Sequence, residues 1–156
     1  MVAPLADRVV YMQDDIECVA NLRQYLELTT THEKSYWNCC AYPANVNPEV
    51  SGWQPAVSPC GLGAQGLVFT NEGLRTLLSS RVVIDHPMDK YRGKEAIDGI
   101  VKTALGRAGF TEMVHNPTLV NHVGTQSTIG HEPQPESYGW RGADWNVMEL
   151  LTNRTL

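Results

Sequence analysis

Three acidic side chains follow the first apolar run of the chain and form the first group that could do chemistry. The run Val9-Val10-Tyr11-Met12 leads directly into Gln13-Asp14-Asp15-Ile16-Glu17. A strand that ends in such a turn places carboxylates at its carboxyl end, where open α/β sheets bind their ligands. Mg²⁺ and Mn²⁺ prefer one or two carboxylates together with substrate phosphates. The alternative is that these residues cap the following helix and complement its dipole.

A histidine segment late in the chain is the second such group. His122 stands near the end of the apolar run Leu119–Val123, and small hydroxyl residues and glycines follow in Gly124-Thr125-Gln126-Ser127-Thr128-Ile129-Gly130-His131. An imidazole at a strand end is a candidate metal ligand, and free backbone N–H groups among small residues suit a diphosphate. The alternative for His122 is a hydrogen-bonded structural histidine.

Hydrophobic periodicity predicts the elements that must position these two groups. The predicted strands cover residues 9–12, 36–41, 67–69, 112–115 and 119–123, and the predicted helices cover residues 22–28, 72–80, 94–108 and 144–151. Thr70 or Asn71 is the expected N-cap of the second helix, and Gly109 is the expected end of the third. Residues 42–59 carry four prolines and are predicted as a long irregular loop. Trp140 and Trp145 are expected packing anchors beside the last helix.

The length and composition are those of one domain with a core of its own. The chain has 156 residues, of which 42% are hydrophobic, and a formal net charge of −5. This charge argues against a broad phosphate-binding face, since affinity for nucleic acid comes mostly from clustered Lys and Arg. No apolar run approaches the roughly 20 residues that cross a bilayer, and the first residues do not resemble a secretion signal, so we expect a cytoplasmic protein.

The four cysteines do not follow the spacing of a metal-binding motif. Cys39 and Cys40 are adjacent, so on a strand their side chains point to opposite faces and do not easily share one metal. Cys18 and Cys60 stand alone in the sequence. We expect reduced, buried thiols, and a disulfide that includes Cys60 is the alternative.

In their order along the chain, these motifs resemble the metal-dependent nucleotide-sugar glycosyltransferases of the GT-A fold. The resemblance implies an α/β domain with a GT-A-like mixed sheet and flanking helices, corresponding to the C-terminal, catalytic half of that fold. The similarity is greatest to the N-acetylglucosaminyltransferases of the branching type IV group. It runs from about residue 6 to about residue 131, with residues 132–156 as a C-terminal extension of the same single domain. Its most specific part is Pro117-Thr118-Leu119-Val120-Asn121-His122-Val123-Gly124-Thr125-Gln126-Ser127-Thr128.

The resemblance implies a metal site and a donor site. Asp15 and His122 would bind Mn²⁺ or Mg²⁺, with Asp14 on the nucleotide ribose or the metal and Glu17 in support. The backbone of the glycine-rich loop, at Gly63 and Gly66, would approach the donor sugar or the acceptor, and an ordinary tight turn is the alternative. The diphosphate would lie against three residues of the histidine segment, namely Ser127, Thr128 and His131. Members of the family carry a basic residue near the last of these positions, so phosphate binding here would depend on pH.

The resemblance also implies a catalytic base that deprotonates the acceptor hydroxyl. Asp85, in Val83-Ile84-Asp85-His86-Pro87, falls where the family keeps that carboxylate at the start of a helix, and Asp89 is the second candidate. The alternative for Asp85 is an N-cap. The sequence leaves open whether the anomeric configuration is inverted or retained.

One part of the family pattern has no counterpart in this sequence. Members bind the nucleotide base with a βαβ-type half that precedes the acidic turn, whereas eight residues precede Val9 here. Three explanations stay open: the chain is a fragment, a homo-oligomer or a partner supplies this half, or the chain binds its donor weakly or in an altered way. Without this half we expect an exposed apolar edge along residues 9–12 that invites self-association.

The expected activity is the transfer of a sugar from a nucleotide-diphosphate donor to an acceptor hydroxyl, such as that of a glycan. Two alternatives stay open. One is a DNA-modifying glycosyltransferase that acts on hydroxymethylated bases, which the net charge disfavours. The other is a non-catalytic binding or scaffold domain derived from such an enzyme, which the missing half favours.

Overall fold

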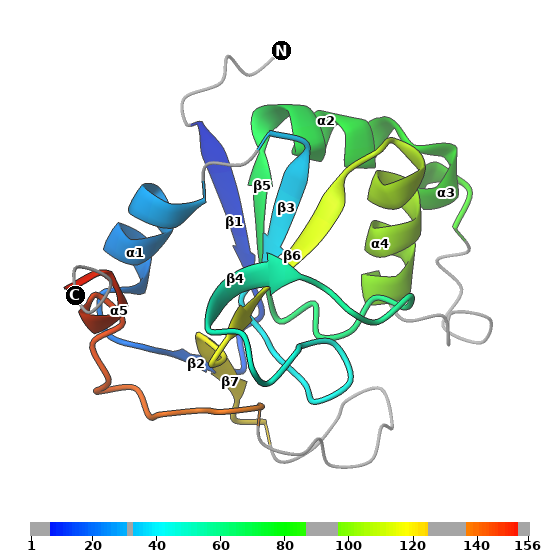
Figure 1. Ribbon diagram of the computed structural model, residues 1–156. Helices are drawn as coiled ribbons and strands as arrows, with labels where there is room; N and C mark the ends of the chain where they lie inside the picture. The colour runs from blue at the N-terminus through cyan, green and yellow to red at the C-terminus, as the bar shows by residue number, and fades with distance from the viewer. Residues whose placement is uncertain (1–6, 31–32, 87–96, 125–136, 153–156) are drawn as a thin grey trace.

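The computed structural model describes residues 7–30, 33–86, 97–124 and 137–152, and these ranges form a mixed α/β structure (Figure 1). Its strands are β1 (Arg8–Met12), β2 (Ile16–Cys18), β3 (Ser35–Asn38), β4 (Gly52–Pro55), β5 (Gly66–Thr70), β6 (Thr111–Asn116) and β7 (Val120–His122). Its helices are α1 (Leu22–Thr29), α2 (Asn71–Ser79), α3 (Arg81–Ile84), α4 (Ile97–Arg107) and α5 (Glu149–Thr152). Within these ranges, no helix has the length and apolar composition that crossing a membrane requires.

The main sheet has five strands in the order β1-β5-β3-β6-β4. Only β3 and β6 are parallel neighbours, and the other adjacent pairs are antiparallel. This arrangement places the carboxyl ends of β1, β3 and β6 at one edge, the lower edge in Figure 1. Strands β2 and β7 form a separate antiparallel pair next to that edge.

Alternating side chains of the sheet build a core on each of its faces. Trp37 and Val68 pair across β3 and β5 and pack with α1, whereas their neighbours Tyr36 and Phe69 pack with α2 and α4. The period of two along a strand explains why consecutive buried residues join different cores. Figure 1 shows α1 and α5 on one side of the sheet and the three other helices on the opposite side.

The second and third predicted helices begin and end for the reasons that the sequence indicates. Thr70 caps α2, because its Oγ1 accepts a hydrogen bond of 3.0 Å from the backbone N–H of Gly73. Helix α4 ends before Gly109, which has a φ of +83°, a backbone conformation that glycine adopts without strain. The predicted positions of both helices are therefore confirmed within the described residues.

Three local predictions are wrong. The acidic turn leads into the short strand β2 before α1, and β4 lies inside the predicted irregular loop. The predicted helix 144–151 shortens to α5. Asn146 forms an isolated parallel β-bridge with Ala20, and the backbone N–H of Val147 donates a hydrogen bond to the carbonyl of Ala20. Each difference comes from a backbone partner far away in the sequence. Trp140 and Trp145 are partly buried against the α1-side core, as expected.

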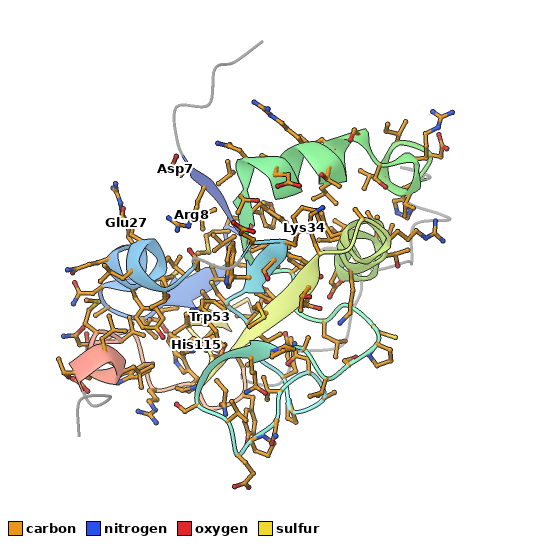
Figure 2. All side chains as sticks on the ribbon, turned by 45° about the horizontal axis from the view of Figure 1, so that its top comes forward. Asp7, Arg8, Glu27, Lys34, Trp53 and His115 are labelled. Atoms are coloured by element: carbon orange, nitrogen blue, oxygen red, sulfur yellow. The ribbon has the colours of Figure 1, made fainter. Side chains whose placement is uncertain are left out.

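His115 lies fully buried in the core on the α1 side of the sheet, next to Trp53 (Figure 2). Its Nδ1 lies 2.6 Å from the carbonyl oxygen of Pro117, and its Nε2 lies 2.8 Å from the hydroxyl of Tyr25. A carbonyl only accepts hydrogen bonds, so Nδ1 donates to Pro117. His115 thus joins α1, β6 and the segment after β6 within the core.

A buried ion pair anchors the glycine-rich loop on the other face. Lys102 of α4 lies 2.8 Å from Glu112 of β6, whose side chain is only 4% exposed. The other carboxylate oxygen of Glu112 accepts from the Asn38 amide, which also donates to the carbonyl of Leu62 in the loop. The lysine donates as well to the carbonyl of Ser58. One charged network therefore fixes both ends of the segment 58–62.

The four cysteines are free thiols. Cys39 and Cys40 are fully buried, and burial raises the pKa of both thiols. Cys60 is exposed and Cys18 is partly buried. The expectation of buried reduced thiols therefore holds for the adjacent pair and not for Cys60.

We predict that Lys102→Met lowers the free energy of unfolding by about 3 kcal/mol, because it leaves the Glu112 carboxylate buried without its cation. Urea denaturation measures the change. Lys34→Met is the matched control, since Lys34 pairs with Glu72 on the surface, where an ion pair contributes about 1 kcal/mol or less. Equal effects of the two substitutions would contradict the assignment.

Candidate functional site

Asp15 and His122 meet at the lower edge of the sheet. Asp15 precedes β2 and His122 ends β7, and the register pairs Ile16 with His122. The backbone N–H of Val123 donates to the carbonyl of Asp15 at 2.9 Å, and His122 Nε2 lies 2.8 Å from Asp15 Oδ2. The imidazole is 17% exposed and the carboxylate 43%, so the pair faces solvent. The structure thus brings together the two residues that the sequence analysis selects as metal ligands, and their role as ligands stays a prediction.

Gly124 is a site residue that the sequence reasoning missed. A Cβ at this position would lie 2.8 Å from Asp15 Oδ2 and 3.0 Å from His122 Cε1. The position therefore has no room for a side chain beside the carboxylate and the imidazole. The signal was present in the sequence, because glycine follows His122 by two residues in the segment that carries the family resemblance.

The donor set is small and suits a hard divalent cation that also binds a substrate. Asp14 and Glu17 are exposed, and among the described residues no third His, Cys, Asp or Glu completes a cluster with Asp15 and His122. Mg²⁺ commonly takes one or two protein ligands and completes its coordination with water and phosphate oxygens. An imidazole and a carboxylate that face solvent fit this pattern.

The loop 61–65 is hydrogen-bonded to the acidic turn at one end and to a second carboxylate, Asp98, near the other. The backbone N–H of Gln13 donates to the carbonyl of Gln65, and the side-chain amide of Gln65 donates to the hydroxyl of Tyr42, both at 3.0 Å. Two residues before Gln65, the N–H of Gly63 donates to Asp98 Oδ2 at 2.8 Å. Asp98 lies in the first turn of α4, and the loop 61–65 thus runs from the acidic turn to the start of that helix.

Tyr42 stays protonated in this arrangement. Burial raises the pKa of its hydroxyl above the usual range, and the nearby Asp98 carboxylate adds to the shift. The sequence analysis did not select Asp98, although an aspartate in the first turn of the predicted helix 94–108 was the available signal.

The predicted base Asp85 lies elsewhere. It is the C-cap of α3, its carboxylate is exposed, and it lies 3.7 Å from Arg81. Helix α3 packs against α2 and α4 in the upper part of Figure 1, whereas β2 and β7 lie at the bottom. The structure therefore does not bring Asp85 to the Asp15–His122 pair, and the residue ends a helix instead of starting one. Asp89 lies outside the described residues.

Gly63 and Gly66 serve the protein's own packing. Gly63 has a φ of +79°, and a Cβ there would lie 2.8 Å from the Tyr42 ring. Gly66 is buried in β5, where a Cβ would lie 3.1 Å from Met12 Sδ and 3.2 Å from Cys39 Cβ. The geometry favours the tight-turn alternative for Gly63, and Gly66 is a buried strand residue and not part of a turn. The proposed diphosphate residues Ser127, Thr128 and His131 lie outside the described residues.

Comparison with known proteins gives no independent assignment: no family model, no curated protein and no solved structure matches this chain.

We predict that Gly124→Ala breaks the hydrogen bond between Asp15 and His122, because the added methyl group would lie too close to the carboxylate. The ring ¹⁵N resonances of His122 measure the change by NMR. Gly106→Ala is the control, since nothing lies within 4 Å of a Cβ at that position in α4. Unchanged His122 resonances in Gly124→Ala would contradict the placement of Gly124.

Proposed function

We propose that this chain is a metal-dependent glycosyltransferase with a GT-A-like fold. It moves a sugar from a nucleotide-diphosphate donor to an acceptor hydroxyl. The observation that carries the proposal is the Asp15–His122 pair, which packs closely against Gly124 and faces solvent at the carboxyl edge of a mixed sheet. Ligands bind at this edge in open α/β sheets. The resemblance of the acidic turn and the histidine segment to this family gives further support.

Asp15 and His122 would hold Mn²⁺ or Mg²⁺, which when bound offsets the negative charge of a diphosphate leaving group. The remaining chemistry belongs to the acceptor. Its hydroxyl oxygen forms a bond to the anomeric carbon of the sugar while the bond to the diphosphate breaks, and the diphosphate leaves with the electron pair. The hydroxyl proton needs a base on the protein.

Asp98 is the base that the geometry supports best. Gly63 holds one carboxylate oxygen at 2.8 Å, and among the described residues the other oxygen is left to accept the proton. The loop 61–65 joins Asp98 to the acidic turn, so both lie at the same edge of the sheet. A single base is what inversion by direct displacement requires. Asp85, by contrast, pairs with Arg81 on α3.

A further part of the proposal concerns the setting of the enzyme. The four free thiols support a cytoplasmic location, where cysteines stay reduced.

The metal site is tested by calorimetry with Mn²⁺, alone and with nucleoside diphosphates such as UDP and GDP. We expect Mn²⁺ binding by the wild-type chain and at least about tenfold weaker binding by His122→Ala, since second-shell changes alone cost about 10- to 100-fold. His86→Ala is the matched control, because that residue lies beyond α3. Binding of neither Mn²⁺ nor a nucleotide by the wild-type chain would leave the non-catalytic scaffold as the better proposal.

The base is tested separately. We predict that Asp98→Asn lowers the transfer rate about 10²- to 10⁴-fold and leaves Mn²⁺ binding unchanged, since an amide still accepts from Gly63 but cannot take up the proton. Transfer to an acceptor, or hydrolysis of the nucleotide sugar, gives the rate. Asp85→Asn should keep the wild-type rate. The reverse result, with Asp85→Asn inactive and Asp98→Asn active, would return the role to Asp85.

A further inference from the structure

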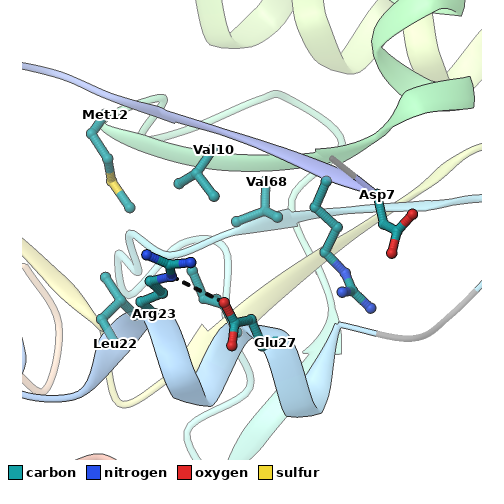
Figure 3. A pocket seen from close by; sticks show the side chains of 9 residues that line it. Asp7, Val10, Met12, Leu22, Arg23, Glu27 and Val68 are labelled. Atoms are coloured by element: carbon teal, nitrogen blue, oxygen red, sulfur yellow. Dashed lines mark hydrogen bonds and ion pairs between the residues drawn. The ribbon is translucent and has the colours of Figure 1, made fainter. Parts of the chain in front are cut away.

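A groove of about 560 Å³ separates β1 from α1 (Figure 3). Its floor is apolar and includes Val10 and Met12 of β1 and Val68 of β5. Figure 3 shows Arg23 and Glu27 reaching up from α1 on one side, where they form an ion pair of 3.0 Å, and Asp7 at the start of β1 on the other. The groove lies beside the outer edge of the main sheet, because β1 is the first strand of the order.

Within the part of the chain that the structure describes, the edge at β1 lacks the features that protect sheet edges from pairing. It has no proline, no lysine and one charged residue, Arg8, whose Nε donates to the carbonyl of Thr30. Val10 and Tyr11 are 46% and 45% exposed although both are apolar. Among the described residues, β1 pairs with β5 alone. Natural edge strands usually carry charges, prolines or covering loops.

The opposite edge, β4, shows these protective features. It ends in Pro55, which has no N–H to offer a further strand. The Gln54 side chain donates to the carbonyls of Asn47 and Val50, which holds the loop 47–50 against the strand. The same sheet thus has one protected and one unprotected edge. We take the difference as a sign that β1 pairs with another polypeptide.

We infer that a second copy of this chain pairs with β1 as an antiparallel strand centred on Val10. In this register Val10 faces Val10 of the second copy and Val9 faces its Tyr11, and β-branched and aromatic residues are favourable cross-strand pairs. Opposed residues share a face of the sheet, so Val10 of each copy would enter the open groove of the other. The two sheets then form one continuous sheet of ten strands, twice the five of one copy.

The charges at the groove favour a second copy over other occupants. Its rim carries two arginines and two acids, namely Arg8, Arg23, Asp7 and Glu27. A two-fold interface brings the same patch against itself, so equal numbers of positive and negative groups can face one another without net repulsion. A nucleic acid or an acidic partner would instead favour a positive rim. This inference does not rest on the proposed enzymatic activity.

Sedimentation velocity of the whole chain over micromolar concentrations tests the inference without metal or nucleotide. The expected result is a species of twice the monomer mass of 17.3 kDa. Val10→Lys should return the chain to the monomer, since it places two ammonium groups opposite each other at the centre of the interface. Tyr11→Lys is a second variant with the same expected result. Leu78→Lys, at an exposed leucine of α2, should stay dimeric.

Circular dichroism and thermal unfolding establish that each variant is folded. A wild-type chain that sediments as a monomer of 17.3 kDa would overturn the inference. The same holds if another protein or another segment of polypeptide proves to occupy this edge. A dimer that persists in folded Val10→Lys and Tyr11→Lys would overturn it too, because the interface would then lie elsewhere.

Discussion

The antiparallel pairing of β2 with β7 is the constraint on which the candidate site depends. It joins segments more than 100 residues apart, since Asp15 and His122 are separated by 107 positions. The backbone bonds continue on both sides of the pair, from Val123 to the Asp15 carbonyl and from Val19 to the Leu119 carbonyl. The backbone of Leu119 also donates to Cys39 at the end of β3. The position of the imidazole against the carboxylate is therefore set by strand pairing, and the side chains add one hydrogen bond.

The second carboxylate is positioned by different means. Asp98 depends on the loop 61–65, which has little regular structure and is held from both sides. Asn38 and Asn45 both donate to the carbonyl of Leu62, and the buried pair of Lys102 and Glu112 supports the first of these asparagines. Gly61 lies so close to the backbone of Asp98 that a Cβ there would overlap its carbonyl oxygen. Buried polar groups and the close packing at glycines thus fix the position of the loop, as strand pairing fixes the position of Asp15.

The sequence predicted the parts of the fold that local patterns determine. Apolar residues at helical spacing, the cap at Thr70 and the stop at Gly109 sufficed for α2 and α4. The strand ends that carry Asp15 and His122 were also identifiable, since apolar runs end there. Strands β2 and β4 were not, because three or four residues carry little periodicity and their pairing partners lie far away. The sequence analysis assigned the base to Asp85 from the order of the motifs alone. Motif order does not indicate that Asp85 is the C-cap of α3.

Strand β1 connects the candidate site to the proposed assembly, because the acidic turn begins where the strand ends. Its charges also restrict the register of a second copy. With Val10 opposite Val10, Asp7 of one copy faces Gln13 of the other, and no two like charges are opposed. A shift by two residues that centres the pair on Tyr11 would place Asp7 opposite Asp15, and like charges directly opposed destabilise a strand pair. A shift the other way, centred on Val9, would leave Met12 beyond the paired residues and reduce the apolar contact. The register that leaves Asp15 free to face His122 is therefore also the register that buries most of the exposed apolar edge.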